Sequence, residues 1–504
     1  EKFVSKTMSN YTNLFKMRKI HQKYPTTGRL LYPIAQVLPH DISRSNPQEI
    51  DPWVYPFVKE FITDAEITDF MQYTRSLYTE EGHYKNLLKY DKSYLPRPKT
   101  AAYLAALQHT SDCFRLPEPV RDISFDNLAD VPFIASSSAG YSYHGSKGDN
   151  DNHTRAIKRV VATIRGLQDY YPSWKQSYRY TPDIAYARTQ LSLLNTPKVR
   201  HVWGKAFHNI IIEGKSAYPL IHAYSSGEYP ISTGIHIYHK IPAIIAEMFS
   251  EPEPHHVYLT DFSGFDSSPM DWLIYDAFDI LEQNLIFNED IDKLCFEYSK
   301  FYFVNTPVKM PDGYIWVKHI GVPSGSYFTQ LIDSVIDHIV LSYCQFSIWN
   351  RFFDTKVLGD DSIFKCPTSL IVPISTLART ALQLGFTIHP DKSKLTDDQR
   401  NVDYLGHLER AGRIWRPHTK SLQLALFPEY PVHSAAESVT RVKGICLDTG
   451  LNSWNLLRLL QTMTSYYGQG TTAWSHEDAN FINSVVMLQK PPSHTDFLAM
   501  WTIT

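Results

Sequence analysis

Two carboxylates stand side by side in KVLGDDSIFK, residues 356–365. Short apolar runs on both sides of Gly359, Asp360 and Asp361 predict two strands joined by a tight turn. Gly-Asp is common in surface turns, where solvent alone screens the charges. A divalent cation would offset the repulsion between adjacent carboxylates more fully. The pair therefore indicates either an exposed turn or a metal site, and the rest of the chain must decide.

A second pair of aspartates lies in LTDFSGFD, residues 259–266. Asp261 is expected at the end of a β-branched and aromatic strand, and Asp266 follows a Ser-Gly turn. By itself this spacing is more typical of aspartates that cap turns. Together with the Gly-Asp-Asp hairpin, however, a strand-end aspartate could hold two Mg²⁺ ions about 3.5–4 Å apart. Such ions suit in-line attack of a hydroxyl on an α-phosphate, with pyrophosphate as leaving group.

A Gly/Ser loop lies between these pairs in the chain, in GVPSGSYFTQLIDS, residues 321–334. Ser324 and Gly325 allow a ligand to approach the backbone closely. Thr329 and Asp333 are four residues apart and therefore share one face of the helix that follows. A plain loop with Thr329 near a helix N-terminus explains the same residues without a ligand.

Basic residues are concentrated between residues 155 and 215, although the net charge of the chain is only −3. RTQLSLLNTPKVRHVWGK, residues 188–205, contains Arg188, Lys198 and Arg200, of which the last two are expected on one face of a strand. Arginine suits bidentate contacts with phosphate, whereas lysine acts as a point charge. The stretch is either a phosphate-facing surface or a solvated face with its counter-charges elsewhere.

The secondary structure expected around these motifs forms one sheet with helices. Short apolar stretches bounded by Gly and Ser alternate with stretches of helical period, which predicts an α+β fold with helices on one face of the sheet. The expected elements are a strand ending at Asp261, a loop and helix over 321–346, strands at 352–358 and 362–366, a helix over 373–384 closed by Gly385, and a mostly helical segment over about the last ninety residues. Lys392 follows a further strand-like run in GFTIHPDKSK, residues 385–394.

Composition restricts the remaining possibilities. The chain is 43% hydrophobic and 20% charged, as in soluble globular proteins. No apolar run reaches about 18 residues, so no membrane span is predicted. The five cysteines form no CxxC pair, which fits a reducing compartment and argues against a structural zinc site.

The motifs between roughly residues 136 and 408 resemble, in order and spacing, those of viral RNA-dependent RNA polymerases. SSSAGYSYHGSKGDN (136–150), PKVRHVWGK (197–205) and the Gly/Ser loop are most similar to the polymerases of partitiviruses, which have segmented double-stranded RNA genomes. Picobirnavirus polymerases are the nearest competitor. Many positive-strand relatives carry Asn where this chain has Asp333, and an Asp can donate a hydrogen bond to a ribose 2′-OH only when it is protonated.

The resemblance implies an α+β right-hand polymerase, in which fingers, palm and thumb surround a template channel. The antiparallel palm sheet would be backed by helices, and contacts between fingers and thumb would close the channel. The implied divisions are an N-terminal arm and fingers at 1–250, the first part of the palm at 251–270, a fingers insertion at 271–320, the second part of the palm at 321–410 and the thumb at 411–504.

The resemblance also implies a role for each motif residue. Asp261 and Asp360 would bind two Mg²⁺ ions with the assistance of Asp361, and Mn²⁺ could substitute. Lys392 would be the general acid for the leaving group. The residues implied to contact the ribose or the triphosphate are Asp266, Ser324, Gly325, Thr329, Asp333, Arg188, Lys198 and Arg200.

By the same resemblance, the chain would be an RNA-directed RNA polymerase that replicates and transcribes a viral double-stranded RNA genome. Its partners would be RNA template and product, NTPs and the viral capsid protein, without a membrane, in the virion interior and the host cytoplasm. A reverse transcriptase shares the paired aspartates but would be expected to place a bulky residue near the sugar instead of Asp266. A non-enzymatic viral RNA-binding or capsid-associated protein would explain the basic stretch but not the convergent carboxylates.

Overall fold

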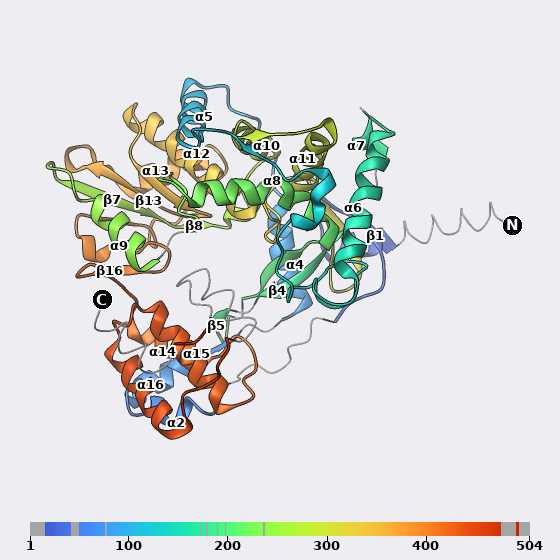
Figure 1. Cartoon of the computed structure of the whole chain (residues 1–504). Coiled ribbons are helices and arrows are strands. Elements are labelled where there is room, and N and C mark those ends of the chain that lie inside the picture. Colours follow the sequence, from blue (N-terminus) through green and yellow to red (C-terminus); the bar gives the residue numbers. More distant parts are fainter. Residues whose placement is uncertain are drawn as a thin grey trace.

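Helices and strands are mixed along the chain, in a large body and a smaller lobe (Figure 1). This confirms the mixed helix and sheet class expected from the sequence. The lobe contains α14 (His418–Leu426), α15 (Ala435–Asp448) and α16 (Trp454–Tyr467). The structure, a computed structural model, describes residues 16–41, 50–75, 78–171, 173–177, 180–188, 190–196, 198–234, 237–474 and 490–492.

A four-stranded antiparallel sheet has the order β12–β13–β7–β15. Its strands are β7 (His255–Thr260), β12 (Thr355–Leu358), β13 (Asp361–Pro367) and β15 (Lys394–Thr396). The register of β7 and β13 runs from His255 with Pro367 to Thr260 with Ser362. The end of β7 therefore meets the turn between β12 and β13, which makes the strand before Asp261 a neighbour of the Gly-Asp-Asp hairpin.

Two helices pack on one face of this sheet, α12 (Thr329–Trp349) and α13 (Ile374–Leu382) (Figure 1). On that face Tyr258 of β7 and Phe364 of β13 stack with their ring centroids 4.7 Å apart. Trp349 of α12 lies edge-on to both rings. The helix expected at 373–384 is thus confirmed as α13.

The opposite face of the sheet is also covered. α9 (Ile237–Glu247) and the hairpin of β16 (Leu408–Arg410) and β17 (Arg413–Trp415) share an apolar core with Val257 and Ile363 (Figure 1). The expectation of helices on one face only is therefore wrong. β7 has apolar residues at positions that point to both faces, so each face needs a cover.

A second sheet has five strands in the order β1–β11–β10–β4–β6. Neighbouring strands are antiparallel except β10 and β4, which are parallel. The edge strand β6 begins with Arg200, so this sheet carries part of the basic stretch. The strands are β1 (Leu31–Gln36), β4 (Asp183–Arg188), β6 (Arg200–Gly204), β10 (Pro307–Lys309) and β11 (Tyr314–Lys318).

The remaining elements surround the two sheets. Three two-stranded pairs are β2 (Tyr73–Arg75) with β5 (Leu191–Leu193), β3 (Val120–Arg121) with β9 (Leu285–Ile286), and β8 (Phe262–Ser263) with β14 (Thr387–Ile388). The other helices are α2 (Tyr55–Val58), α3 (Asp64–Phe70), α4 (Glu80–Leu87), α5 (Ala101–Cys113), α6 (Asn152–Gln168), α7 (Trp174–Ser177), α8 (Phe207–Ser225), α10 (Asp271–Glu282) and α11 (Asp290–Val304).

The smaller lobe joins C-terminal helices to a segment from near the N-terminus. α2 and α3 share one apolar core with α14, α15 and α16. Buried Asp51 accepts hydrogen bonds from Arg441 at 2.6 Å and from Ser438 at 2.7 Å. The helical C-terminal segment is confirmed as far as residue 474, while residues 475–489 and 493–504 lie outside the described residues.

α12 is long and apolar enough to cross a membrane by composition alone. However, 83% of its most apolar window is buried inside the protein, as in the core helix of a globular domain. Its length is therefore weak evidence for a span. That the protein acts without a membrane stays a prediction.

Candidate active site

The Gly-Asp-Asp motif forms the turn between β12 and β13. Leu358 pairs with Asp361, so Gly359 and Asp360 are the two turn residues. Gly359 has a φ of +66°, a left-handed value that primed two-residue hairpin turns need and that a side chain would strain. Its N–H donates a hydrogen bond of 2.8 Å to Oγ of Ser334 on α12. The tip of the hairpin is therefore fixed to the helix that packs against the sheet.

Asp261 lies beside this turn. The last registered pair of β7 and β13 is Thr260 with Ser362, so Asp261 and Asp361 are the next residues on the two neighbouring strands. Asp261 is exposed and Asp361 is half-buried. The structure thus brings the strand-end aspartate and the hairpin aspartates to the same edge of the sheet.

The loop that contains Lys392 is anchored on Asp261. The N–H of Asp261 donates to Oγ of Ser393 at 2.9 Å, and its carbonyl accepts from the N–H of His389 at 2.8 Å. Lys392 is exposed in this loop, and no hydrogen bond or ion pair joins it to an aspartate within the described part of the chain. Its loop is therefore placed next to the carboxylates, while its ammonium group is not held against them.

Carboxyl groups repel one another at this edge of the sheet. The pKa of Asp361 is raised to about 7, first by burial and then by the charges of Asp403, Asp360 and Asp261. The N–H of Leu405 donates to Oδ2 of Asp361 at 3.0 Å and opposes part of this rise. Loss of solvent also raises the pKa of Asp360, and the charge of Asp261 adds to it. The edge therefore carries an excess of negative charge.

Asp266 is held near these groups by the Gly/Ser loop. It lies in the 3₁₀ turn η3 (Phe265–Ser267), where its carbonyl accepts a hydrogen bond of 2.6 Å from the N–H of Val322. The hydroxyl of Ser324 donates to its Oδ2. Burial raises the pKa of Asp266, the Ser324 hydrogen bond opposes this, and the charge of Asp360 raises it further. Asp266 and Ser324 form a polar pair next to the hairpin turn.

Asp333 is buried in α12, where its side chain is 5% exposed. Its Oδ1 has no hydrogen-bond partner among the described residues. Burial raises its pKa well above the usual range, and the charges of Asp266, Asp360 and Asp337 raise it further. These surroundings favour the protonated carboxyl, which can donate a hydrogen bond as an Asn side chain can.

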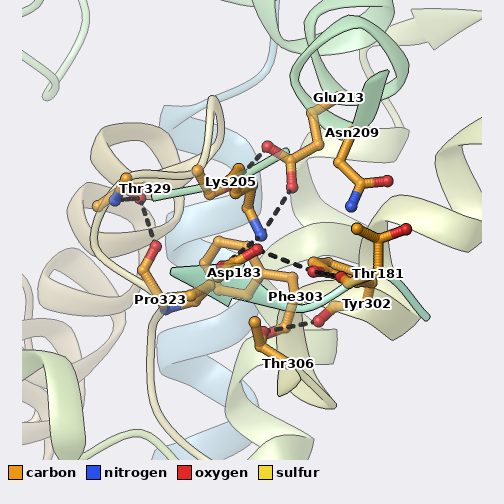
Figure 2. A network of polar contacts seen from close by, with 12 residues as sticks. Thr181, Asp183, Lys205, Asn209, Glu213, Tyr302, Phe303, Thr306, Pro323 and Thr329 are labelled. Atoms are coloured by element: carbon orange, nitrogen blue, oxygen red, sulfur yellow. Dashed lines mark hydrogen bonds and ion pairs between the residues drawn. The ribbon is translucent and has the colours of Figure 1, made fainter. Parts of the chain in front are cut away.

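The Gly/Ser loop rests on β6. The N–H of Trp203 donates to the carbonyl of Ser324 at 2.7 Å, and a Cβ on Gly325 would lie only 2.2 Å from the Trp203 carbonyl oxygen. Gly325 also has a φ of +130°, so only glycine fits there. Oγ1 of Thr329 accepts from the N–H of Gly325 at 3.3 Å and donates to the carbonyl of Pro323 at 3.2 Å (Figure 2). The Thr329 hydroxyl is therefore engaged in shaping the loop.

A buried network of charged and hydroxyl side chains stabilises the Gly/Ser loop (Figure 2). Nζ of Lys205 lies 3.4 Å from a carboxyl oxygen of Asp183 and 3.4 Å from one of Glu213. The hydroxyl of Tyr302 donates to Asp183 at 2.8 Å, and the hydroxyl of Ser326 donates to Glu213 at 2.8 Å. Burial raises the pKa of both carboxyls, and the charge of Lys205 opposes the rise. The network ties β4, β6 and α8 to the loop.

Arg200 is the basic residue that the structure brings to the carboxylates. Its charge lowers the pKa of Asp266 and of Asp360, against the larger effects that raise them. Arg200 lies directly across from Arg188 of β4. Like charges in this position repel, so an anion bound there would stabilise the strand pair. Arg188 is turned partly toward the smaller lobe, with its Nε 3.8 Å from Glu429.

Lys198 is exposed and lies two residues before β6 begins. The expectation that Lys198 and Arg200 share one face of a strand is therefore wrong. β4 ends at Arg188, which pairs with Arg200, so Lys198 has no strand residue opposite it.

Sequence analysis did not identify two further carboxyl groups, Asp403 and Asp337, that lie close to the site. Asp403, in DYLGHL, acts on Asp361 electrostatically, and the turn after it supplies the Leu405 N–H. Nothing local to that stretch indicates an acidic site. Asp337 is buried in α12, and burial raises its pKa well above the usual range. Its position four residues after Asp333, on the same helix face, was a usable signal.

The donor set fits divalent cations. Asp261, Asp360 and Asp361 offer carboxylate oxygens on one edge, and among the described residues none of the three forms an ion pair. Hard cations such as Mg²⁺ prefer such oxygen ligands. A bound cation would also relieve the mutual repulsion that raises the pKa of Asp361.

The comparison with known sequences defines the class of protein. The profile of the family described as viral RNA-dependent RNA polymerase matches residues 67–471. The match covers most of the chain and includes every residue of the site described above. The chain therefore belongs to this family of viral polymerases.

Two curated relatives are similar over shorter stretches. The RNA-directed RNA polymerase of Cryptosporidium parvum virus 1 (strain KSU-1) is 36% identical over 115 residues, which are 22% of this chain and 21% of the relative. The RNA-directed RNA polymerase of Atkinsonella hypoxylon virus (isolate 2H) is 27% identical over 167 residues, 31% of this chain and 25% of the relative. The similarity thus spans a quarter or less of each relative.

Proposed function

We propose that the chain is an RNA-directed RNA polymerase, which adds nucleotides from NTPs to an RNA 3′-OH and releases pyrophosphate. The observation that carries this proposal is the convergence of Asp261, Asp360 and Asp361 on one sheet edge, with Arg200 and Asp266 next to them. Membership of the viral polymerase family supports it. The names of the two relatives support the same activity.

Asp261 and Asp360 are proposed to hold two Mg²⁺ ions, with Asp361 as a secondary ligand, and Mn²⁺ could take their place. Such ions activate the attacking hydroxyl and neutralise charge on the leaving pyrophosphate. The protein keeps the ligands in place through the sheet register and through the hydrogen bond from Gly359 to Ser334. Lys392 is proposed to donate a proton to pyrophosphate, which requires its loop to bring the ammonium group closer.

Asp266, Ser324 and Asp333 are proposed to recognise the ribose. Asp266 already accepts a hydrogen bond from Ser324, and a ribose 2′-OH could join this pair as a further donor. A protonated Asp333 would supply a donor where many relatives have Asn. Thr329 and Gly325 act by fixing the loop that carries Ser324.

Arg200, Arg188 and Lys198 are proposed to bind the triphosphate. Arg188 and Arg200 lie across from each other on neighbouring strands, so their guanidinium groups repel each other. A bound triphosphate would reduce this repulsion. Lys198 is exposed in the segment that leads into β6 and could reach a phosphate as a point charge.

The chain is further proposed to form a right hand. The four-stranded sheet with α12 and α13 would be the palm over residues 251–270 and 321–410, with fingers at 1–250 and 271–320 and the thumb at 411–504. Two contacts favour a closed hand. α2 and α3 pack into the core of the C-terminal helices, and Nε of Arg75 donates to the carbonyl of Phe427 at 2.8 Å.

The biological setting is proposed from the same resemblance. The motif strings most similar to partitivirus polymerases favour a double-stranded RNA genome, which the enzyme would replicate and transcribe. Template and product RNA, NTPs and the viral capsid protein would be its partners. Its place would be the virion interior and the host cytoplasm.

Primer extension on an RNA template tests the proposed activity. Purified protein with Mg²⁺ should incorporate labelled UTP in preference to labelled dTTP. Preference for dTTP would favour a reverse transcriptase-like polymerase. Binding of RNA without incorporation of either nucleotide would favour a non-enzymatic RNA-binding protein and overturn the proposal.

A further inference from the structure

Three side chains that can bind a metal lie together between α5 and α12, apart from the aspartates. Ligand atoms of His109, Cys113 and His338 lie within 4.8 Å of one another. His109 and Cys113 are four residues apart on α5 and therefore share one face of that helix. His338 comes from α12, the helix that holds the hairpin turn through Ser334.

The spacing of the ligand atoms suits tetrahedral coordination. Sγ of Cys113 lies 3.6 Å from Nε2 and 3.8 Å from Nδ1 of His109. In a tetrahedral site with Zn–N of about 2.0 Å and Zn–S of about 2.3 Å, a nitrogen and a sulfur ligand are about 3.6 Å apart. Because Sγ is almost equally far from both ring nitrogens, the His109 ring must turn to direct one nitrogen at a cation that it shares with Cys113.

The ring of His338 is oriented by neighbouring hydroxyls. Its Nδ1 lies 2.9 Å from Oγ1 of Thr110 and 3.4 Å from Oγ of Ser342. A histidine whose Nδ1 donates to such a partner carries the lone pair on Nε2, the usual arrangement for a metal-binding histidine. His338 is buried, so this orientation is well defined by its surroundings.

Burial keeps both histidines neutral and the cysteine protonated in the absence of a metal. Burial lowers the pKa of His109 and lowers that of His338 to about 3, so both rings are neutral at physiological pH. Burial raises the pKa of Cys113 to about 11, with the charges of Asp112 and Asp354 adding to the rise. These surroundings favour the protonated thiol, so a cation would have to displace the thiol proton on binding.

Ring packing is the alternative explanation of the cluster. His109 stacks on Phe352 with ring centroids 3.9 Å apart and an interplanar angle of 6°. The rings of His109 and His338 also stack on each other, with centroids 5.5 Å apart, and Phe114 lies edge-on to His338. Stacking accounts for the half-buried His109 ring and the buried His338 ring but does not require a thiol beside them. A direct measurement of bound metal distinguishes the two explanations.

We propose that His109, Cys113 and His338 bind one Zn²⁺ ion, with water in the fourth position, and that this ion joins α5 to α12. The lack of CxxC pairs in the sequence argued against a structural zinc site. The ligands here are instead an HxxxC pair on one helix and a histidine far along the chain. Because α12 also carries Asp333 and Ser334, the ion would stabilise the helix that supports the hairpin turn.

Cobalt substitution tests the proposal on the intact chain. After removal of metals by a chelator, Co²⁺ should produce the thiolate-to-cobalt absorption in the near ultraviolet and the intense visible bands of a tetrahedral site. About one equivalent of Zn²⁺ should abolish both signals and raise the melting temperature. Cys113→Ser should lose the near-ultraviolet band and weaken Zn²⁺ binding at least about tenfold.

His222→Gln is the matched control, because His222 is an exposed histidine on α8, away from the cluster. It should keep the wild-type spectrum and Zn²⁺ affinity. Circular dichroism of each variant checks that the fold is retained, and His109→Gln gives an independent second ligand variant. Absence of a thiolate band in the wild-type protein, or an unchanged band in Cys113→Ser, overturns the proposal.

Discussion

The protein contains two clusters of charged side chains, one buried and one at the edge of a sheet. The buried cluster includes a cation beside its carboxyls, whereas the cluster at the sheet edge consists of carboxyls without an ion-pair partner among the described residues. In the buried group, Lys205 lies between Asp183 and Glu213, and the hydroxyl groups of Tyr302 and Ser326 donate further hydrogen bonds to these carboxyls. At the sheet edge, Asp261, Asp360 and Asp361 converge and no described residue forms an ion pair with them.

This difference indicates that the buried group supports the fold and that the sheet-edge group is suited to chemistry. A buried network in which the acids share a cation holds its elements in one arrangement, and loss of that cation leaves the acids unpaired in a medium of low polarity. An unbalanced group of carboxylates is unfavourable without a ligand, and such groups are candidates for cation binding. Substitution in the buried group should therefore change stability, and substitution at the sheet edge should change activity.

The largest effect is expected from Asp360→Ala. Loss of a metal ligand should reduce nucleotide addition on the order of a thousandfold or more, while the exposed turn should keep its fold. Primer extension and a thermal melt measure the two properties. Asp397→Ala, which changes an exposed aspartate just after β15, serves as control and should stay active. Extension by Asp360→Ala at a near-normal rate would remove Asp360 from the ligand set.

Lys205→Met should act on stability instead. It leaves Asp183 and Glu213 buried without their cation, which should lower the free energy of unfolding by about 3–5 kcal/mol. Lys293→Met removes an exposed lysine 3.8 Å from Glu282 and should cost less than about 1 kcal/mol. Urea denaturation of both variants measures the difference, and equal losses would mean that the buried network is not held by Lys205.

Asp266→Ala should change sugar selection more than overall activity. If Asp266 meets the ribose 2′-OH, its loss should lower the preference for UTP over dTTP by about tenfold to a hundredfold, equivalent to about 1–3 kcal/mol. Competing incorporation of the two labelled nucleotides measures this ratio. Equal loss of both activities would contradict a role in sugar recognition and leave Asp266 as a structural turn residue.

A change in the pH dependence of stability is expected from Asp361→Asn in metal-free protein. The pKa of Asp361 is about 7 in the folded chain and about 4 in an unfolded one, so folding favours the protonated carboxyl. Wild-type stability should therefore fall as the pH rises from about 4 to about 7, and Asp361→Asn should lose less over this range. Urea denaturation with a chelator measures both proteins. A parallel pH dependence would show that Asp361 does not titrate in this way.

The response to metal ions distinguishes the roles of Asp360 and Asp361 at the sheet edge. Mg²⁺ should restore the stability of wild-type protein at about pH 8 more than that of Asp361→Asn, because a cation neutralises the carboxylate charge. In extension assays, Mn²⁺ should partly rescue Asp361→Asn, since it binds such sites somewhat more tightly than Mg²⁺. Identical metal profiles for Asp360→Asn and Asp361→Asn would mean that the two carboxylates are equivalent.

Local patterns in the sequence predicted the elements that carry the site. Gly359 between two apolar runs indicated the hairpin, and the period of the apolar residues indicated α12 and α13. These predictions succeeded because turn chemistry and side-chain periodicity act over a few residues. The strand expected to hold Lys198 failed because its length depends on where its partner β4 ends.

The charge balance of each cluster was decided only by the tertiary structure. The sequence by itself determined that Asp261, Asp360 and Asp361 end strands or turns, and that Gly325 and Ser324 form a loop before a helix. It did not determine that Asp403 joins the aspartates, that Lys205 is buried between two acids, or that His338 meets His109 and Cys113. These contacts join residues far apart in the chain. The burial that shifts their pKa values exists only after the sheets and helices have packed.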